Sequence, residues 1–263
     1  MPGRIPGQPD AIGLRQANDD DEDNAVWRHK DKPKEVGGMS KQNLSADTAG
    51  ANTLSDRVFE QLEEGILDGS ILPGENLNEI KISAEYGVSR TPVREAIRML
   101  EQKNLVRLVP NKGAVVLGVN TKDLLDVYAI RSYIEGLASR WAAENITAEK
   151  SKKLREIVDL QEFYYLKSNP DQVSEMDSRF HETIFNYCES RRLEHMLRDL
   201  HHMIQRYRKQ SIAEVGRTEK AIAEHRLILD AICGGDGDAA ERLTAIHINN
   251  AKENLLTLLE QDR

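Results

Sequence analysis

GVSRTPVREAIRML, residues 87–100, has the pattern of a sharp turn that opens into an amphipathic helix. Gly87 can adopt the positive φ of a tight turn, and Pro92 suits the first helical position. Thr91, directly before this proline, is therefore the better candidate for the N-cap. We expect a helix that begins near Arg90.

The two faces of this helix differ in character. Its apolar face carries, at helical spacing, Val93, Ala96, Ile97 and Leu100. Another face carries Arg90, Arg94 and Arg98, which recur every four residues. Arginines near a helix N-terminus suit the major groove of DNA, where they bind guanine edges and phosphates. A solvated arginine face with acidic partners has the same spacing, so this pattern alone leaves both interpretations open.

Length and composition predict a helical protein of two domains with a tail. The chain has 263 residues, of which 30% are charged and 5% aromatic. The formal net charge of −8 argues against indiscriminate binding to nucleic acid, yet basic side chains outnumber acidic ones between residues 90 and 112. The N-terminus lacks the pattern of a signal sequence, and no apolar run reaches the ~18 residues of a membrane span. We therefore expect a cytoplasmic protein that is not inserted in a membrane.

The residues around the arginine helix predict a DNA-binding domain over 51–119. Residues 1–50 are rich in Pro, Gly, Asp and Asn and are expected to form a disordered extension. Its acidic run, residues 19–23, can compete with DNA for the basic face or be an inert tail. The expected elements are, in chain order, helices over 54–67 and 79–86, the arginine helix, and β-prone runs at 105–109 and 114–117.

These residues resemble the GntR family of transcriptional regulators. The family's winged helix-turn-helix has a pattern like Pro73-Gly74-Glu75, then VSRTPVREA at residues 88–96, then a Lys-Gly wing. The resemblance implies contacts with DNA phosphates and base edges, and a wing along the adjacent minor groove. The residues implied are Ser89, Arg90, Thr91 and Arg94, with Arg98 as a further candidate, and Lys112 and Gly113 in the wing. The chain departs from the family at Asn104, where a glycine is frequent.

Residues 120–263 have a wholly helical pattern, with little Pro or Gly and apolar residues at every third or fourth position. Capping residues, of which Thr121 is the first, and glycine breaks predict helices over 121–144, 147–167, 169–188, 191–213, 217–232 and 238–259. The expected fold is therefore mainly α. A winged helix-turn-helix of three helices and a β-hairpin is followed by an all-helical bundle over residues 120–263.

Four side chains in this bundle have the types and spacing of metal ligands. Asp177 and His181 lie one helical turn apart, and His225 and His247 lie beside apolar residues of two later helices. Three imidazoles and a carboxylate suit a divalent transition metal. A histidine on an apolar face is also commonly a hydrogen-bonded core residue, so spacing alone leaves both alternatives open.

Residues 122–259 resemble the FCD domain, the ligand-binding domain of the FadR-type branch of the GntR family. Its metal-binding members carry Asp-x-x-x-His, a His after Glu and a His before Ile, which match Asp177, His181, His225 and His247. The resemblance implies that these residues bind a divalent transition metal, zinc in the first place, with nickel or manganese as alternatives.

Arg131 is the candidate for recognising an effector. The helix around it resembles the family's Arg-x-x-x-Glu helix, in which it can bind a carboxylate or hydroxyl group. An intrahelical pair between Arg131 and Glu135 explains the pattern equally well. The chain departs from the family at Glu189-Ser190, where Gly-Asn is frequent.

These patterns favour a sequence-specific transcriptional regulator, expected to be a repressor. A homodimer would place two arginine helices in successive major grooves of a palindromic operator, and a small organic acid in the metal-containing pocket would change their spacing. One alternative is a regulator that senses the metal ion itself. Another is a metal-dependent enzyme that activates water, which the attached helix-turn-helix and the lack of an acid or base motif disfavour.

Overall fold

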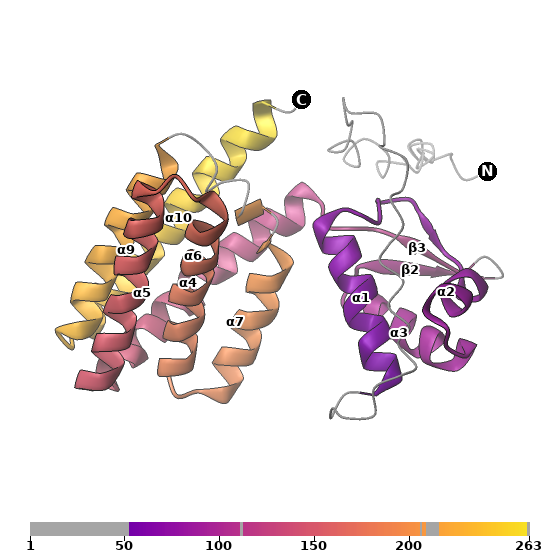
Figure 1. The fold of residues 1–263 in the computed structure, drawn as a ribbon, viewed down its shortest axis with the longest axis horizontal. Coiled ribbons are helices and arrows are strands. Elements are labelled where there is room, and N and C mark those ends of the chain that lie inside the picture. Colours follow the sequence, from indigo (N-terminus) through magenta and orange to yellow (C-terminus); the bar gives the residue numbers. More distant parts are fainter. Residues whose placement is uncertain (1–52, 111–112, 206, 209–215, 262–263) are drawn as a thin grey trace, which may run out of the picture.

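The computed structural model describes residues 53–110, 113–205, 207–208 and 216–261 of the chain. Within these residues the protein is built mainly from helices, with one small antiparallel sheet, so the predicted fold class is confirmed (Figure 1). The predicted N-terminal extension and Lys112 lie outside the described residues.

The N-terminal part of the described chain is a winged helix-turn-helix. Its elements are α1 (Leu54–Asp68), β1 (Asn76–Leu77), α2 (Glu79–Tyr86), α3 (Arg90–Gln102), β2 (Val106–Val109) and β3 (Gly113–Val116). The central strand β3 pairs antiparallel with both β1 and β2, with Ala114 opposite Leu108. The pairing of β2 with β3 forms the predicted wing. The sequence pattern does not indicate β1, because a strand of two residues is too short for a recognisable alternation.

The arginine helix forms as expected, with one correction at its start. Gly87 has φ 67°, α3 begins at Arg90, and the predicted apolar face is buried. The N-cap is Ser89, so the prediction of Thr91 was wrong. Pro92 is therefore the third helical residue, where its missing N–H costs no hydrogen bond because the first N–H groups of a helix have no partner within it.

The C-terminal part is a helical bundle. Its described helices are α4 (Thr121–Glu144), α5 (Ala148–Leu166), α6 (Pro170–Tyr187), α7 (Arg191–Met203), α9 (Arg217–Cys233) and α10 (Gly237–Gln261). The long helices α4 and α10 pack against each other (Figure 1). Asn120 rather than Thr121 caps α4, because the Asn120 side chain accepts from the Asp123 amide in a capping box.

Helix α7 ends earlier than the predicted helix over 191–213. Ile204 leaves the helical conformation, with φ −106° and ψ 4°. Its side chain is fully buried in an apolar cluster, and residues 205 and 207–208 are helical again. Residues 209–215 lie outside the described chain.

Two apolar clusters hold these elements together. One lies inside the bundle and includes Leu154, Phe180 and Leu229. The other joins the core of the winged helix-turn-helix to the first turns of α4, to Ile204 and to residues of α10 such as Leu255. The DNA-binding domain therefore packs against the bundle through shared apolar side chains.

Candidate functional site

The predicted DNA-binding side chains at the start of α3 are all exposed. They are Ser89, Arg90, Thr91, Arg94 and Arg98, and the opposite face of α3 packs into the core. The Ser89 side chain makes no capping hydrogen bond, so its hydroxyl is not used by the helix. An exposed helix N-terminus with arginines and a free hydroxyl is suited to binding phosphate.

Glu79, at the start of α2, orients two of these arginines. Its carboxylate accepts two hydrogen bonds from Arg94, at 3.1 Å from Nε and 2.9 Å from Nη2, and a third from Arg90 Nη2 at 3.2 Å. The hydrogen bond from Arg94 lowers the pKa of Glu79 below its ordinary value. A bidentate pair of this kind fixes the plane of the guanidinium. The sequence pattern does not indicate this role of Glu79, because the pair joins two different helices.

The wing borders the same surface. An open groove of about 620 Å³ is lined by α2, by Arg90 and Arg94 of α3, and by wing residues that include Gly113. Gly113 has φ 89°, and a Cβ there would lie 2.8 Å from the Leu77 carbonyl oxygen, so glycine is required at this position. The structure thus brings the start of α3 and the wing to one groove.

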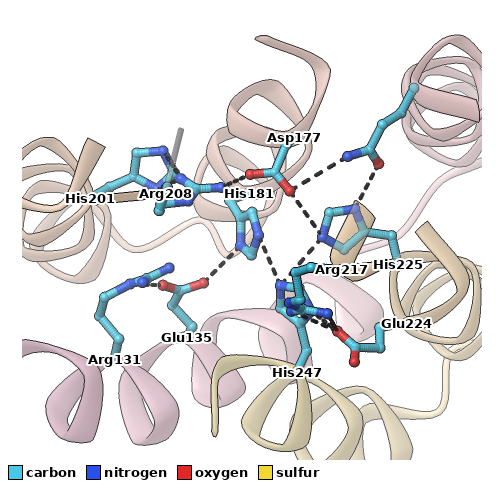
Figure 2. Close-up of polar contacts among 11 residues, drawn as sticks. Arg131, Glu135, Asp177, His181, His201, Arg208, Arg217, Glu224, His225 and His247 are labelled. Carbon is cyan, nitrogen blue, oxygen red and sulfur yellow. Dashed lines mark hydrogen bonds and ion pairs between the residues drawn. The ribbon is translucent and has the colours of Figure 1, made fainter. Parts of the chain in front are cut away.

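Three histidines from three helices converge inside the bundle. His181 of α6, His225 of α9 and His247 of α10 are each at most 4% exposed (Figure 2). Their Nε2 atoms face one another, and that of His247 lies 3.3 Å from His181 Nε2 and 3.4 Å from His225 Nε2. One ring nitrogen of each lies within 4.8 Å of the others, close enough for all three to bind one metal ion.

The second ring nitrogen of each histidine is held by a side-chain oxygen from another helix. The Nδ1 pairs are His181 with Glu135 at 2.9 Å, His225 with Gln161 at 2.8 Å, and His247 with Glu224 at 2.6 Å. Because these oxygens accept hydrogen bonds, each Nδ1 carries a proton and each Nε2 keeps a lone pair. The outer partners thereby set the tautomer of all three rings.

Three nitrogen lone pairs are therefore directed at one buried point. Burial lowers the pKa of His181 well below its ordinary value and that of His225 to about 3, so these rings are neutral at physiological pH. Acceptor atoms at such short distances repel one another unless a positive charge lies between them. The donor set and its outer partners fit a divalent transition metal.

Asp177 supplies a carboxylate beside the three histidines. It lies on α6 one turn before His181, and its Oδ1 is 3.6 Å from His225 Nε2. Its Oδ2 accepts a hydrogen bond from Arg208. Burial alone would raise the pKa of Asp177, but Arg208 and the histidines outweigh burial, and the net pKa lies well below its ordinary range. The structure thus places Asp177 beside His225, while the group whose ligand atoms all lie within 4.8 Å of one another consists of the three histidines.

A small cavity of about 30 Å³ adjoins the histidines, and three arginines line it: Arg131, Arg208 and Arg217. Arg131 is 1% exposed, and its Nε lies 2.5 Å from Oε1 of Glu135. Arg131 therefore forms the intrahelical pair and also lines the cavity, while its role in binding an effector stays a prediction. The sequence pattern does not indicate Arg208 and Arg217, because their place beside the histidines depends on how the helices pack.

Tyr128 of α4 lines the same cavity and is 1% exposed. Its hydroxyl has no hydrogen-bond partner among the residues that the structure describes. Such a group costs about 1–3 kcal/mol unless a water or ligand satisfies it. The cavity therefore combines this hydroxyl with three guanidinium groups, each of which already donates to a carboxylate: Arg131 to Glu135, Arg208 to Asp177 and Arg217 to Glu224.

The winged helix-turn-helix with its exposed arginine helix, joined to a helical bundle, defines a DNA-binding transcriptional regulator. Residues 54–116 match the model of the bacterial regulatory proteins of the gntR family, and residues 126–250 match the FCD domain. The chain belongs to the GntR family of transcriptional regulators, with an FCD domain after its DNA-binding domain. Every helix in the described ranges is too short or too polar to cross a membrane.

Similar proteins include known repressors. The chain is 26% identical over 209 residues to the HTH-type transcriptional repressor RspR of Escherichia coli (strain K12), covering 80% of this chain and 92% of RspR. It is 24% identical over 224 residues to the galactonate operon transcriptional repressor of the same strain, covering 76% of this chain and 96% of that repressor. The solved structure of E. coli McbR/YncC has the same fold, with a TM-score of 0.62, 22% identity, and coverage of 80% of this chain and 98% of that one.

The Glu79–Arg94 pair leads to a prediction about operator binding. We expect Arg94→Ala to weaken binding to a DNA duplex, selected from random sequences by the wild-type protein, by about 10- to 100-fold, because one oriented guanidinium contact is lost. Arg242→Ala, which removes an exposed arginine of α10, is the matched control and should bind normally. Fluorescence anisotropy at fixed salt measures both affinities, and circular dichroism checks the helical content. Equal affinity of the Arg94 variant and the wild type would contradict this role.

Proposed function

We propose that this regulator is a repressor whose affinity for its operator is controlled by an organic acid bound beside a metal ion in the FCD domain. The observation that carries the proposal is the convergence of three buried Nε2 lone pairs, each fixed by an outer hydrogen bond, next to a cavity lined by arginines. Repression is supported by the names of the two similar E. coli proteins.

The DNA-binding part of the proposal assigns the start of α3 to the major groove. Ser89, Arg90, Thr91 and Arg94 would contact phosphates and base edges, with Arg98 further along the helix, and Lys112 with Gly113 would follow the minor groove. A homodimer would place its two α3 helices about 34 Å apart on a palindromic operator. Exposed apolar side chains on α4 and α10, such as Tyr133 and Ile246, support association with a second copy.

The metal part of the proposal assigns four ligands: Asp177, His181, His225 and His247. Zinc fits best, because neutral imidazoles with fixed Nδ1 partners are the nitrogen ligands it prefers, and nickel or manganese are the alternatives. When bound, the ion supplies a Lewis-acid anchor for an oxygen ligand. The outer residues Glu135, Gln161 and Glu224 hold the rings in the orientation that this binding needs.

The effector part of the proposal assigns a hydroxycarboxylic acid. Arg131, Arg208 and Arg217 supply positive charge for a carboxylate, and the Tyr128 hydroxyl is a donor or acceptor that no described residue uses. The similar repressor of the galactonate operon bears the name of a sugar acid with these groups. A carboxylate and a hydroxyl on neighbouring carbons can both approach the metal, which distinguishes such acids from simple anions.

A second candidate function is sensing of the metal ion alone. The small size of the cavity, about 30 Å³, favours it, because that volume suits one or two waters rather than a sugar acid. In that case operator affinity would respond to the metal in the absence of any organic ligand.

Removal of one histidine tests the metal site. We expect His225→Ala to lower the affinity for Zn²⁺ by more than about 100-fold, because a ligand contributes more than the outer partners that are worth about 10- to 100-fold. His195→Ala, which removes an exposed histidine of α7, should bind Zn²⁺ like the wild type. Competition with a chromophoric chelator measures the affinities. Unchanged zinc affinity in the His225 variant would exclude this set of ligands.

Tyr128→Phe tests the effector site without disturbing the fold. The Tyr128 hydroxyl has no hydrogen-bond partner among the described residues, so its removal should cost no stability. In thermal melting without ligand, the Tyr128→Phe variant should therefore be at least as stable as the wild type. With zinc and D-galactonate as the probe, the stabilising shift should be smaller in this variant, because one hydrogen bond to the ligand is lost. Tyr165→Phe, at a side chain of α5 that is 37% exposed, is the control. A clearly lower melting temperature of the ligand-free Tyr128→Phe variant would contradict the assignment of this hydroxyl to the effector site. So would a ligand-induced rise in melting temperature as large as that of the wild type.

A further inference from the structure

Helix α7 takes part in both apolar cores of the molecule. Its N-terminal half packs into the bundle through Leu193 and Leu197, which are 7% and 0% exposed. Its C-terminal half contributes Leu200 and Met203, followed by Ile204, to the cluster that includes the core of the DNA-binding domain. A displacement of α7 would therefore change the packing of both the bundle and the DNA-binding domain.

An ionic cluster ties α7 to the DNA-binding domain. Glu63 of α1 is only 6% exposed, and its carboxylate lies 2.9 Å from Lys103 Nζ and 3.6 Å from His202 Nδ1. Lys103 Nζ also lies 3.4 Å from Oδ1 of Asp199. Lys103 is the residue that directly follows α3, so α7 holds the C-terminal end of the arginine helix through this lysine.

His201, the residue next to His202 on α7, faces the three histidines of the candidate metal site. His201 is 5% exposed, its ring centroid lies 5.9 Å from that of His181, and its ring is in contact with the Arg208 guanidinium. Arg208 in turn donates to Asp177 (Figure 2). His201 and His202 thus place two adjacent residues of one helix against the candidate metal site and against the DNA-binding domain.

The packing leaves room for this end of α7 to shift. An open crevice of about 230 Å³ lies between parts of α6 and α7, which also contact each other, and is lined by Ser178, Glu182, Arg198, His201, His202 and Gln205. Closely packed interiors resist displacement, whereas a helix that borders a cavity can move without forcing its neighbours apart. The crevice lies beside the two histidines that make the contacts described above.

We propose that α7 transmits the state of the metal site to the DNA-binding domain, with Asp199 and His202 as the residues that couple it to Lys103 and Glu63. The inference rests on the proposed metal site. An ion bound by Asp177 and His181 alters the charge that Arg208 and His201 experience, which favours a different position of the end of α7. Because that end holds Lys103, the orientation of α3 on DNA changes with it. The ion shifts the equilibrium only because it binds the two positions of α7 unequally.

The test compares two double variants of the full-length protein. Asp199→Asn/His202→Gln replaces the carboxylate and the imidazole that α7 contributes to the cluster by neutral amides. The two side chains are 69% and 42% exposed, so folding should be preserved. Glu194→Gln/His195→Gln is the matched control, since it also removes one acid and one histidine from α7, and Glu194 pairs with Arg198 of the same helix. Zinc affinity is measured for each protein, and operator affinity is measured with and without Zn²⁺.

We expect all three proteins to bind Zn²⁺ equally. Zinc should change operator affinity by at least about fivefold in the wild type and the control, and by less than about twofold in the Asp199/His202 variant. A full response in that variant would overturn the role of α7 and leave the metal site intact. Zinc binding without any change in wild-type operator affinity would also overturn it. A wild type that does not bind zinc would refute the proposed metal site and this inference together.

Discussion

Three histidine nitrogens that face one another in a buried space are the constraint on which the candidate site depends. Lone pairs at such short separations repel one another in a region of low dielectric, and a shared cation would relieve that repulsion. The proton of each ring lies on Nδ1, on the opposite side, where an oxygen of Glu135, Gln161 or Glu224 accepts a hydrogen bond from it. The three histidines and their Nδ1 partners thus come from five helices of the bundle: α4, α5, α6, α9 and α10.

The same principle of outer support recurs on the DNA-binding surface. Glu79 holds Arg94 and Arg90 from α2, as Glu135 holds His181 from α4. In each case a carboxylate fixes a group that would otherwise lose conformational freedom on binding. The difference is burial: the arginines remain exposed to solvent, whereas the histidines are enclosed and depend entirely on their partners.

The sequence was sufficient for the parts of this protein that rest on local patterns. Residues 87–100 contain the turn, the proline and both faces of the arginine helix in one segment, and only its N-cap was predicted wrongly. Asp177 and His181 are likewise related by a spacing of one helical turn. The sequence pattern could not show which side chains hold the Nδ1 atoms of the histidines, nor the places of Arg208, Arg217 and the Tyr128 hydroxyl. These positions follow from packing between distant segments. The two departures from the family pattern are instructive: Asn104 and Glu189 have φ of 57° and 56°, the left-handed region in which glycine is frequent. The backbone conformation is kept although the glycine is not.

Anomalous X-ray diffraction from crystals of natively purified protein tests whether His181, His225 and His247 surround a metal ion. We expect an anomalous peak at about 2.0–2.2 Å from all three Nε2 atoms and from one oxygen of Asp177. An anomalous map with no peak at this point, in crystals where the three rings keep the Nδ1 partners described here, would contradict it.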